Sequence, residues 1–239
     1  MIELRDVSYR IGAKQILSHL SLRVEAGERL VLLGRSGSGK TTALKMINGL
    51  LFPLEGAVLV EGKPTTEWDL VRLRRRIGYV IQDAGLFPHF TVAQNVGLVP
   101  RLEGWEPSRI TARVNELLSM IDLPPEQFRD RFPRELSGGQ RQRVGVARAL
   151  AADPPVLLLD EPFGALDPVT RHEIQQQFLR VAERLGKTAI FVTHDAREAM
   201  LVATRIGLLR EGRLEALERP AEFMNAPGEE AQAFRACLG

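Results

Sequence analysis

The sequence has 239 residues and a single cysteine, Cys237, so the chain cannot form a disulfide within itself. It has no run of about 20 consecutive apolar residues, the length that a membrane-spanning helix needs. Its first residues, MIELRDVSYR, contain no apolar signal core. The formal net charge is only +2, whereas nucleic-acid-binding proteins usually present a strongly basic face. We therefore expect a cytoplasmic protein that does not bind nucleic acid.

Hydrophobic residues make up 44% of the chain and charged residues 26%, as in ordinary globular proteins. Short apolar runs alternate with longer stretches of helical periodicity, which predicts an α/β core with a largely parallel sheet. The expected strands are 29–33, 77–81, 156–159 and 188–192, and the expected helices are 41–50, 110–120, 138–151 and 171–185.

The remaining segments have other patterns. Short β-like pieces at 2–9, 20–24 and 56–60 predict an antiparallel sheet beside the core, and the segment after Gly207 predicts a closing hairpin and a short helical tail. The pattern indicates one domain, 1–239. Its core, with the β subdomain, comprises 1–82 and 152–239, and a helical insert comprises 83–151.

The strongest local motif is GRSGSGKT, from Gly34 to Thr41, which matches the phosphate-binding loop pattern in full. It follows an expected strand and opens an expected helix, as such loops do. Lys40 is expected to bridge the β- and γ-phosphates of a nucleotide, and the Thr41 hydroxyl to ligate Mg²⁺. The predicted nucleotide-binding residues here are Gly34, Arg35, Ser36, Gly37, Ser38, Gly39, Lys40, Thr41 and Thr42.

The run VLLLDE supplies the second part of such a site. Its apolar residues predict a buried strand, and Asp160 at the end of this strand is suited to holding Mg²⁺. Glu161 follows directly, where a carboxylate could orient and deprotonate an attacking water. Two adjacent acids with separate roles favour a hydrolase over a small-molecule kinase.

Three further residues are candidates. Gln82 follows an expected strand, and its amide could ligate Mg²⁺ or water and still release it. His194 ends another strand, where a γ-phosphate contact would be needed, although histidines at strand ends are often structural. Tyr9, one of two tyrosines, is either an aromatic residue on the sheet surface or a stacking partner for adenine.

The segment LSGGQRQRVGVARAL begins at Leu136 with an unusual helix start. Ser137 and Gln140 have the spacing of a capping box. Gly138 and Gly139 lie inside the first turn, where each glycine costs about 1 kcal/mol relative to alanine. Glycine is favoured where the backbone must come very close to another group.

These motifs, in this order, resemble those of the ATP-binding subunits of ABC transporters over nearly the whole chain. LSGGQ at 136–140 is the signature of that family, and GRSGSGKT, VLLLDEP, the triplet Ala165–Leu166–Asp167 and His194 match its other elements. The resemblance implies that two copies pair head to tail. Ser137, Gly138, Gly139 and Gln140 of one copy would then contact the γ-phosphate of ATP held by the phosphate loop of the other. It also implies that Glu161 is the catalytic base, with His194, Gln82 and Lys40 as further catalytic residues.

A finer resemblance is to importers of glycine betaine and other quaternary-ammonium osmoprotectants. The segments GYVIQDAGLFPHFTVAQNVGLVPRLEGW, DEPFGALDPVTR and FVTHDAREAM carry it. It implies an ATPase that lies at the inner face of the cell membrane and drives a permease. A solute-binding protein would be an indirect partner. Importers of amino acids or phosphonates share parts of these segments and remain an alternative. A soluble ABC ATPase acting on ribosomes or DNA is less favoured, because the chain has one phosphate loop and no long heptad run.

The segment 85–96, GLFPHFTVAQNV, holds Phe87, Pro88, His89 and Phe90 without a clear helical or strand period. One interpretation is a small local core under a loop. The other is an exposed apolar surface that receives a helix of the permease.

Overall fold

The computed structural model describes residues 1–82, 84–164 and 167–238, with the side chains of residues 183 and 184 left out. The chain divides into two compact units. Unit 1 comprises Met1–Arg74 and Thr188–Gly239, and unit 2 comprises Arg75–Lys187. We describe each unit by itself.

One sheet of unit 1 is antiparallel and has the strand order β2-β1-β4-β5. Its strands are β1 (Ile2–Ile11), β2 (Lys14–Val24), β4 (Glu55–Val60) and β5 (Lys63–Pro64). Ile2, Leu4 and Val7 of β1 are buried, while Arg5 and Asp6 are exposed, so one face of this strand forms core. The predicted antiparallel sheet is confirmed, although β1 and β2 both extend further toward their connecting turn at Gly12 than predicted.

The second group of strands in unit 1 runs in the order β10-β9-β3-β8. Its strands are β3 (Arg29–Leu33), β8 (Thr188–Thr193), β9 (Arg205–Arg210) and β10 (Arg213–Glu218). β3 is parallel to both β8 and β9, and β10 is antiparallel to β9, which forms the predicted closing hairpin. Residues Leu30–Leu33 are at most 1% exposed, as expected for a parallel strand covered on both faces.

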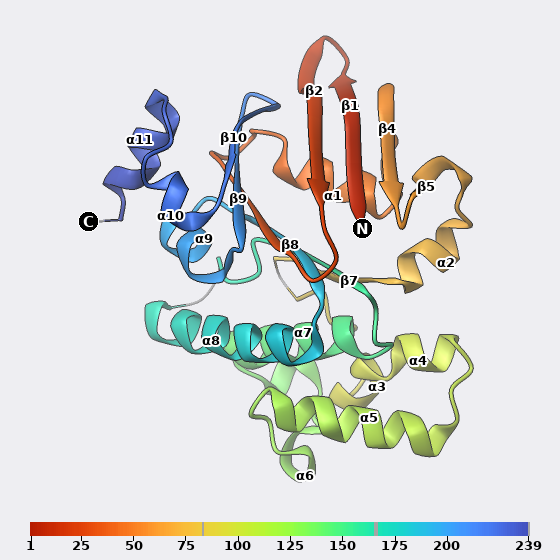
Figure 1. The fold of residues 1–239 in the computed structure, drawn as a ribbon. Coiled ribbons are helices and arrows are strands. Elements are labelled where there is room, and N and C mark those ends of the chain that lie inside the picture. Colours follow the sequence, from red (N-terminus) through yellow and green to blue (C-terminus); the bar gives the residue numbers. More distant parts are fainter. Residues whose placement is uncertain (83, 165–166, 239) are drawn as a thin grey trace. The chain divides into compact units, whose positions relative to one another are not determined.

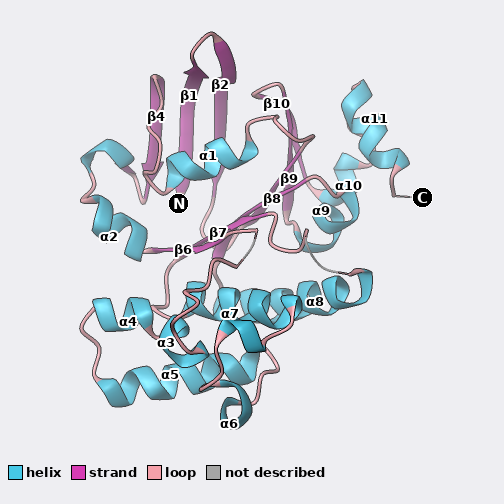
Figure 2. Cartoon of the chain, turned by 180° about the vertical axis from the view of Figure 1, so that it is seen from behind, coloured by secondary structure: helices cyan, strands magenta, loops and turns pink. Residues whose placement is uncertain are grey.

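The helices of unit 1 are drawn in cyan in Figure 2. They are α1 (Lys40–Ile47), the 3₁₀ turn Thr65–Glu67, α2 (Leu70–Arg75, which ends at the first residue of unit 2), α9 (Ala196–Val202), α10 (Pro220–Phe223) and α11 (Glu229–Ala236). α1 packs against strands of both groups, β2 and β4 of the antiparallel sheet and β8 of the second group. The helix that follows the predicted phosphate loop is thereby held by strands of both groups.

Unit 2 has two parallel strands, β6 (Ile77–Val80) and β7 (Val156–Asp160), within an otherwise helical chain. Its helices are α3 (Val92–Val96), α4 (Leu98–Leu102), α5 (Pro107–Met120), α6 (Pro125–Phe128), the 3₁₀ turn Pro133–Glu135, α7 (Gly138–Leu150) and α8 (Pro168–Leu185). The described residues between β6 and β7 form no strand, as the sequence predicts. α7 packs against β6 and against α3, α5 and α8.

The predicted α/β fold, with a largely parallel core, an N-terminal antiparallel sheet and a helical segment, is confirmed. The predicted end of the first helix at residue 50 is wrong. α1 ends at Ile47 because Gly49 takes a left-handed conformation with φ +66°, a common glycine stop signal. In the parts of the chain that the structure describes, no helix combines the length and the apolar character needed to cross a bilayer.

Candidate functional site

The predicted phosphate loop connects β3 to α1 in unit 1 and curls around the side chain of Lys40. Gly39 precedes the helix with φ +103°, a left-handed conformation that favours glycine. Lys40 is only 4% exposed, and its Nζ donates hydrogen bonds to the carbonyl oxygens of Gly34 (2.7 Å) and Arg35 (2.9 Å). The lysine therefore lies inside the curve of the loop, where a phosphate group would meet it.

The turn between β9 and β10 supports this loop from its outer side. The N–H of Gly212 donates to the carbonyl of Ser38 (3.0 Å). A β-carbon at Gly34 would come within 2.2 Å of the Leu209 carbonyl oxygen, so position 34 has no room for a side chain. The glycine that opens the motif is thus required by packing against β9.

His194 follows β8 in unit 1 and is exposed. The loop that carries it is fixed on both sides. The Thr193 hydroxyl donates to the buried carboxylate of Glu198 and accepts from the N–H of Asp195 (3.0 Å), and Asp195 caps α9. Such a loop holds His194 at a defined place at the end of a core strand.

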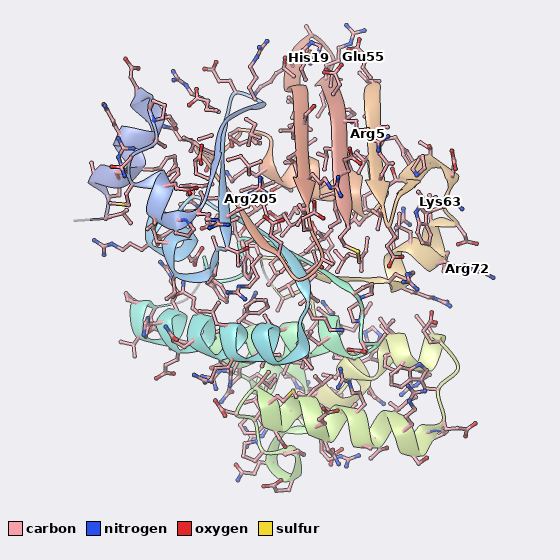
Figure 3. The ribbon with its side chains drawn as sticks, in the orientation of Figure 1. Arg5, His19, Glu55, Lys63, Arg72 and Arg205 are labelled. Carbon is pink, nitrogen blue, oxygen red and sulfur yellow. The ribbon has the colours of Figure 1, made fainter. Side chains whose placement is uncertain are left out.

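Tyr9 lies on β1 and is half-buried. It lines a cavity of about 690 Å³ together with Ser8, Arg10, Gln15, Ser18, His19, Leu54 and Glu55. His19 and Glu55 are labelled in Figure 3, at one end of the antiparallel sheet. Tyr9 borders this open space, and stacking of its ring on an adenine base stays a prediction.

In unit 2, Asp160 ends β7, and Tyr79 lies on the neighbouring parallel strand β6. The Tyr79 hydroxyl donates a hydrogen bond to Asp160 Oδ2 (3.3 Å). Burial, and then the charge of Asp160, raises the pKa of Tyr79 well above its ordinary value, so this hydroxyl stays a donor at neutral pH. Tyr79, which no local sequence pattern singles out, thus orients the carboxylate that was predicted to hold Mg²⁺.

Gln82 and Glu161 follow β6 and β7, and their side chains approach the same point. A β-carbon built at Gly164 would lie 3.6 Å from Gln82 Nε2 and 3.8 Å from Glu161 Oε2. Glu161 has φ +46°, an uncommon conformation for a residue other than glycine, and backbone strain of this kind clusters at functional sites. Unit 2 therefore brings Gln82, Asp160 and Glu161 to the carboxyl ends of two adjacent strands.

The donors predicted for Mg²⁺ are oxygens of the hard type that this ion prefers: the Thr41 hydroxyl, the Gln82 amide and the Asp160 carboxylate. Within the described residues there is no cluster of three or more histidine, cysteine, aspartate or glutamate side chains that could hold a metal alone. Mg²⁺ usually keeps several waters and binds through one or two carboxylates and substrate phosphates. Gln82 and Asp160 of unit 2 fit that mode of binding, and the contribution of Thr41 of unit 1 stays a prediction.

The helix start at LSGGQ forms as predicted. Ser137 caps α7: its hydroxyl accepts from the N–H of Gln140 (3.2 Å), while the Gln140 side chain accepts from the N–H of Ser137 (2.9 Å). The predicted capping box is confirmed. Ser137 and Gly138 are exposed, and the hydroxyl proton of Ser137 remains able to donate. This helix start therefore presents the Ser137 hydroxyl and Gly138 to solvent, whereas the predicted contact residue Gly139 is buried.

Ala165 and Leu166 of the matched triplet lie outside the described residues. Asp167 is described, and its Oδ1 accepts from the N–H groups of Val169 (3.2 Å) and Thr170 (3.1 Å), so it caps α8. The pKa of Asp167 lies below its ordinary value, chiefly because the Thr170 side chain donates to it. α8 accordingly begins at Pro168, three residues before the predicted start, with proline in the first turn.

A comparison with known proteins matches the family model described as "ABC transporter" to residues 17–164. The chain is 47% identical over 235 residues to the osmoprotectant import ATP-binding protein OsmV of Salmonella typhimurium. It is also 47% identical over 232 residues to the glycine betaine/carnitine/choline transport ATP-binding protein OpuCA of Bacillus subtilis. Each match covers 96% of this chain but only 62% and 60% of the two relatives, so the chain spans about three fifths of their length.

Among solved structures, the fold is similar to that of the ATP-binding cassette MJ0796, a dimer bound to ADP and Pi in a post-hydrolysis state. The TM-score is 0.82 at 37% sequence identity, and the match covers 92% of this chain and 99% of that one. The phosphate loop, the LSGGQ helix start and the paired strand ends thus occur in a fold that solved cassettes share. The resemblance inferred from the motifs is confirmed: the chain belongs to the ABC transporter family.

Proposed function

We propose that this chain hydrolyses ATP to drive a membrane permease that imports glycine betaine or another quaternary-ammonium osmoprotectant. The observation that supports it most is the 47% identity, over 96% of the chain, to ATP-binding proteins named for osmoprotectant and glycine betaine transport. The curled loop around Lys40 supports the nucleotide-binding part of the proposal independently.

Each site residue has a role in this proposal. The N–H groups of Gly37 and Gly39 and the ammonium of Lys40 bind phosphate oxygens, and Tyr9 stacks on adenine. Glu161 accepts a proton from the attacking water, and Gln82 and His194 position that water and the γ-phosphate. Thr41, Gln82 and Asp160 would hold Mg²⁺, which when bound would neutralise charge on the phosphate oxygens.

The proposal includes a head-to-tail pair of two copies at the inner face of the membrane, with 83–151 as the insert that carries the signature. In each composite site, Ser137, Gly138, Gly139 and Gln140 of one copy would contact the γ-phosphate on the phosphate loop of the other. Helix starts favour anions because their N–H groups and dipole point outward. Among the described residues, a β-carbon at Gly138 would meet only the end of the Arg141 side chain, at 3.9 Å. Packing within the chain thus does not require glycine there, which supports an outside partner.

The loop after Gln82 is the proposed contact with the permease. Phe87 is 41% exposed, and its ring contacts those of His89 and Phe90. The fully buried Asn95 fixes the loop beneath them: it accepts from the Phe87 N–H (2.8 Å) and donates to the carbonyls of Phe87 and Phe90. A fixed loop that exposes an aromatic ring favours the docking interpretation over the local core.

Replacing Phe87 by glutamate should therefore disrupt the complex with the permease without unfolding the subunit. A charge in an apolar groove is strongly unfavourable unless it is paired. A surface substitution usually changes the free energy of unfolding by no more than about 0.5 kcal/mol. Co-purification with the membrane partner should fall at least about tenfold, while the thermal unfolding curve stays close to that of the wild type.

Met224→Glu is the matched control, because Met224 is 43% exposed at the end of α10. It should co-purify normally. If Phe87→Glu co-purifies as the wild type does, the contact lies elsewhere. If it fails to fold, the local-core interpretation is correct.

The solute is tested with the assembled transporter. The subunit is co-purified with its permease and solute-binding protein, reconstituted in vesicles, and assayed for ATP hydrolysis with glycine betaine, choline, carnitine, an amino acid and a phosphonate. We expect stimulation by a quaternary-ammonium solute. Stimulation only by an amino acid or a phosphonate would transfer the chain to the alternative importer group, and no ATP hydrolysis at all would refute the proposal.

A further inference from the structure

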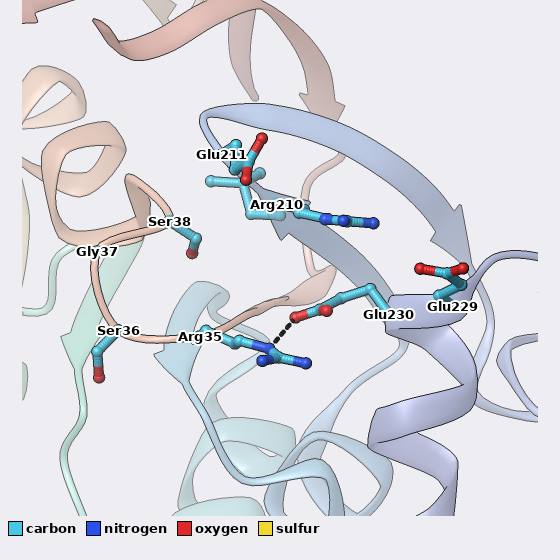
Figure 4. A pocket seen from close by; sticks show the side chains of 9 residues that line it. Arg35, Ser36, Gly37, Ser38, Arg210, Glu211, Glu229 and Glu230 are labelled. Carbon is cyan, nitrogen blue, oxygen red and sulfur yellow. Dashed lines mark hydrogen bonds and ion pairs between the residues drawn. The ribbon is translucent and has the colours of Figure 1, made fainter. Parts of the chain in front are cut away.

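The C-terminal helix α11 reaches the phosphate loop through an ion pair between residues 195 positions apart in the sequence. Arg35 Nε donates to Glu230 Oε1 at 2.8 Å, and Figure 4 shows the two side chains pointing toward one another. The Glu230 side chain is only 6% exposed, whereas that of Arg35 is 71% exposed. A carboxylate buried to this extent needs a partner, because burial without one is costly.

Arg35 also contributes to the inner side of the loop. Its carbonyl oxygen accepts a hydrogen bond from Lys40 Nζ (2.9 Å), the group expected to bind phosphate. The side chain of Arg35 therefore contacts α11, and its backbone carbonyl contacts Lys40. A change at Glu230 can reach the lysine through this single residue.

A cavity of about 380 Å³ lies beside the ion pair (Figure 4). Its lining includes loop residues 35–38, Arg210 at the end of β9, Glu211 of the turn that follows, and Glu229 and Glu230 of α11. Because this space is open, an Arg35 side chain released from Glu230 would have room to move. The loop backbone at residue 35 would then gain conformational freedom that nucleotide binding must remove.

The helix itself is anchored independently of the ion pair. Ala231 and Phe234 are 0% and 8% exposed, and Arg235 Nη1 donates to the Ala226 carbonyl (2.5 Å). Removing the charge of Glu230 should therefore leave α11 in place and weaken only its ion pair with Arg35 of the loop.

We propose that Glu230 is a positioning residue of the nucleotide site: it preorganises the phosphate loop through Arg35. This inference rests on the proposed function of that loop. Preorganisation strengthens binding by reducing the ordering cost. Since the loop holds the β-phosphate, which ADP and ATP share, the affinities for both nucleotides depend on the pair.

The test is Glu230→Gln in the full chain, with Glu229→Gln as matched control, because Glu229 is the exposed neighbour on the same helix. Calorimetric titration with ADP and with ATP, each with Mg²⁺, should give dissociation constants about three- to tenfold higher for Glu230→Gln. Glu229→Gln should bind as the wild type does. In ATP hydrolysis, Glu230→Gln should raise KM by the same factor and leave kcat within about twofold.

Arg35→Gln and the double variant give the second measurement. If the two side chains act as one unit, the dissociation constant of the double variant for ADP should not exceed the larger of the two single-variant values. Equal nucleotide affinities of Glu230→Gln and Glu229→Gln would overturn the proposal. So would a double variant whose loss of affinity is the product of the losses in the two single variants. If Lys40→Ala binds nucleotide more weakly while Glu230→Gln binds it as the wild type does, this inference is refuted but the nucleotide site is not. An unaffected Lys40→Ala would refute the nucleotide site itself.

Discussion

Lys40→Ala should lower the affinity for ATP and ADP roughly 10- to 150-fold. A hydrogen bond to a charged group contributes about 1.5–3 kcal/mol, and each 1.4 kcal/mol corresponds to a factor of ten. Lys40 Nζ also donates to the carbonyl oxygens of Gly34 and Arg35, so the substitution removes two contacts that hold the loop curled. Nucleotide titration and steady-state ATP hydrolysis measure the loss.

Lys45→Ala controls for the loss of a lysine from the same helix. Lys45 is exposed and lies in the last turn of α1, away from the loop. Its replacement should leave nucleotide affinity unchanged, and circular dichroism should show that both variants fold. Near-wild-type hydrolysis by Lys40→Ala would contradict the assignment of this loop as the catalytic site.

The features that the sequence predicted well are local. The capping box needs only Ser137 and Gln140, three positions apart, and both hydrogen bonds are present. Strand ends were located from short apolar runs, so Gln82 and Asp160 could be placed at the carboxyl ends of strands before their pairing was known. The end of α1 was missed because the apolar pattern continues to Leu50, although Gly49 signals a stop.

The features that it could not predict depend on contacts between distant segments. Tyr79 donates to Asp160 across 81 positions, and this contact requires the register of β6 on β7. Arg35 and Glu230 are separated by 195 positions, and the phosphate-loop motif that contains Arg35 does not indicate this partner. A phosphate-loop motif predicts the backbone of a site. The side chains that support it come from segments that are distant in the sequence and that only the fold brings into contact.

Glu161→Gln should bind ATP, nearly stop its hydrolysis, and accumulate as a dimer. The amide keeps the size and reach of the carboxylate but cannot accept the proton of the attacking water. Lys40, Thr41 and Asp160 remain, so nucleotide binding is retained. Since hydrolysis is the step expected to separate the two copies, a variant that cannot hydrolyse should stay paired. Light scattering coupled to size exclusion, with ATP, with ADP and without nucleotide, measures the mass.

The γ-phosphate should decide whether the dimer forms. ADP lacks this group, so it should leave Glu161→Gln monomeric even at saturating concentration. A variant that binds ATP and stays monomeric would contradict the composite site, whereas a dimer that also forms without nucleotide would show an interface independent of the ligand.

Ser137→Arg, added to Glu161→Gln, tests which part of the partner contacts that phosphate. Ser137 is exposed at the start of α7, where its hydroxyl would face the ligand. Arginine cannot fit where a small hydroxyl meets phosphate oxygens, so the ATP-dependent dimer should be lost. Ser119→Arg in the same background adds the same charge at an exposed serine of α5 and should keep the dimer. Loss in both variants would indicate a general charge effect. Retention in both would move the γ-phosphate contact away from LSGGQ, because a contact that survives a bulky side chain at Ser137 does not pass through this helix start.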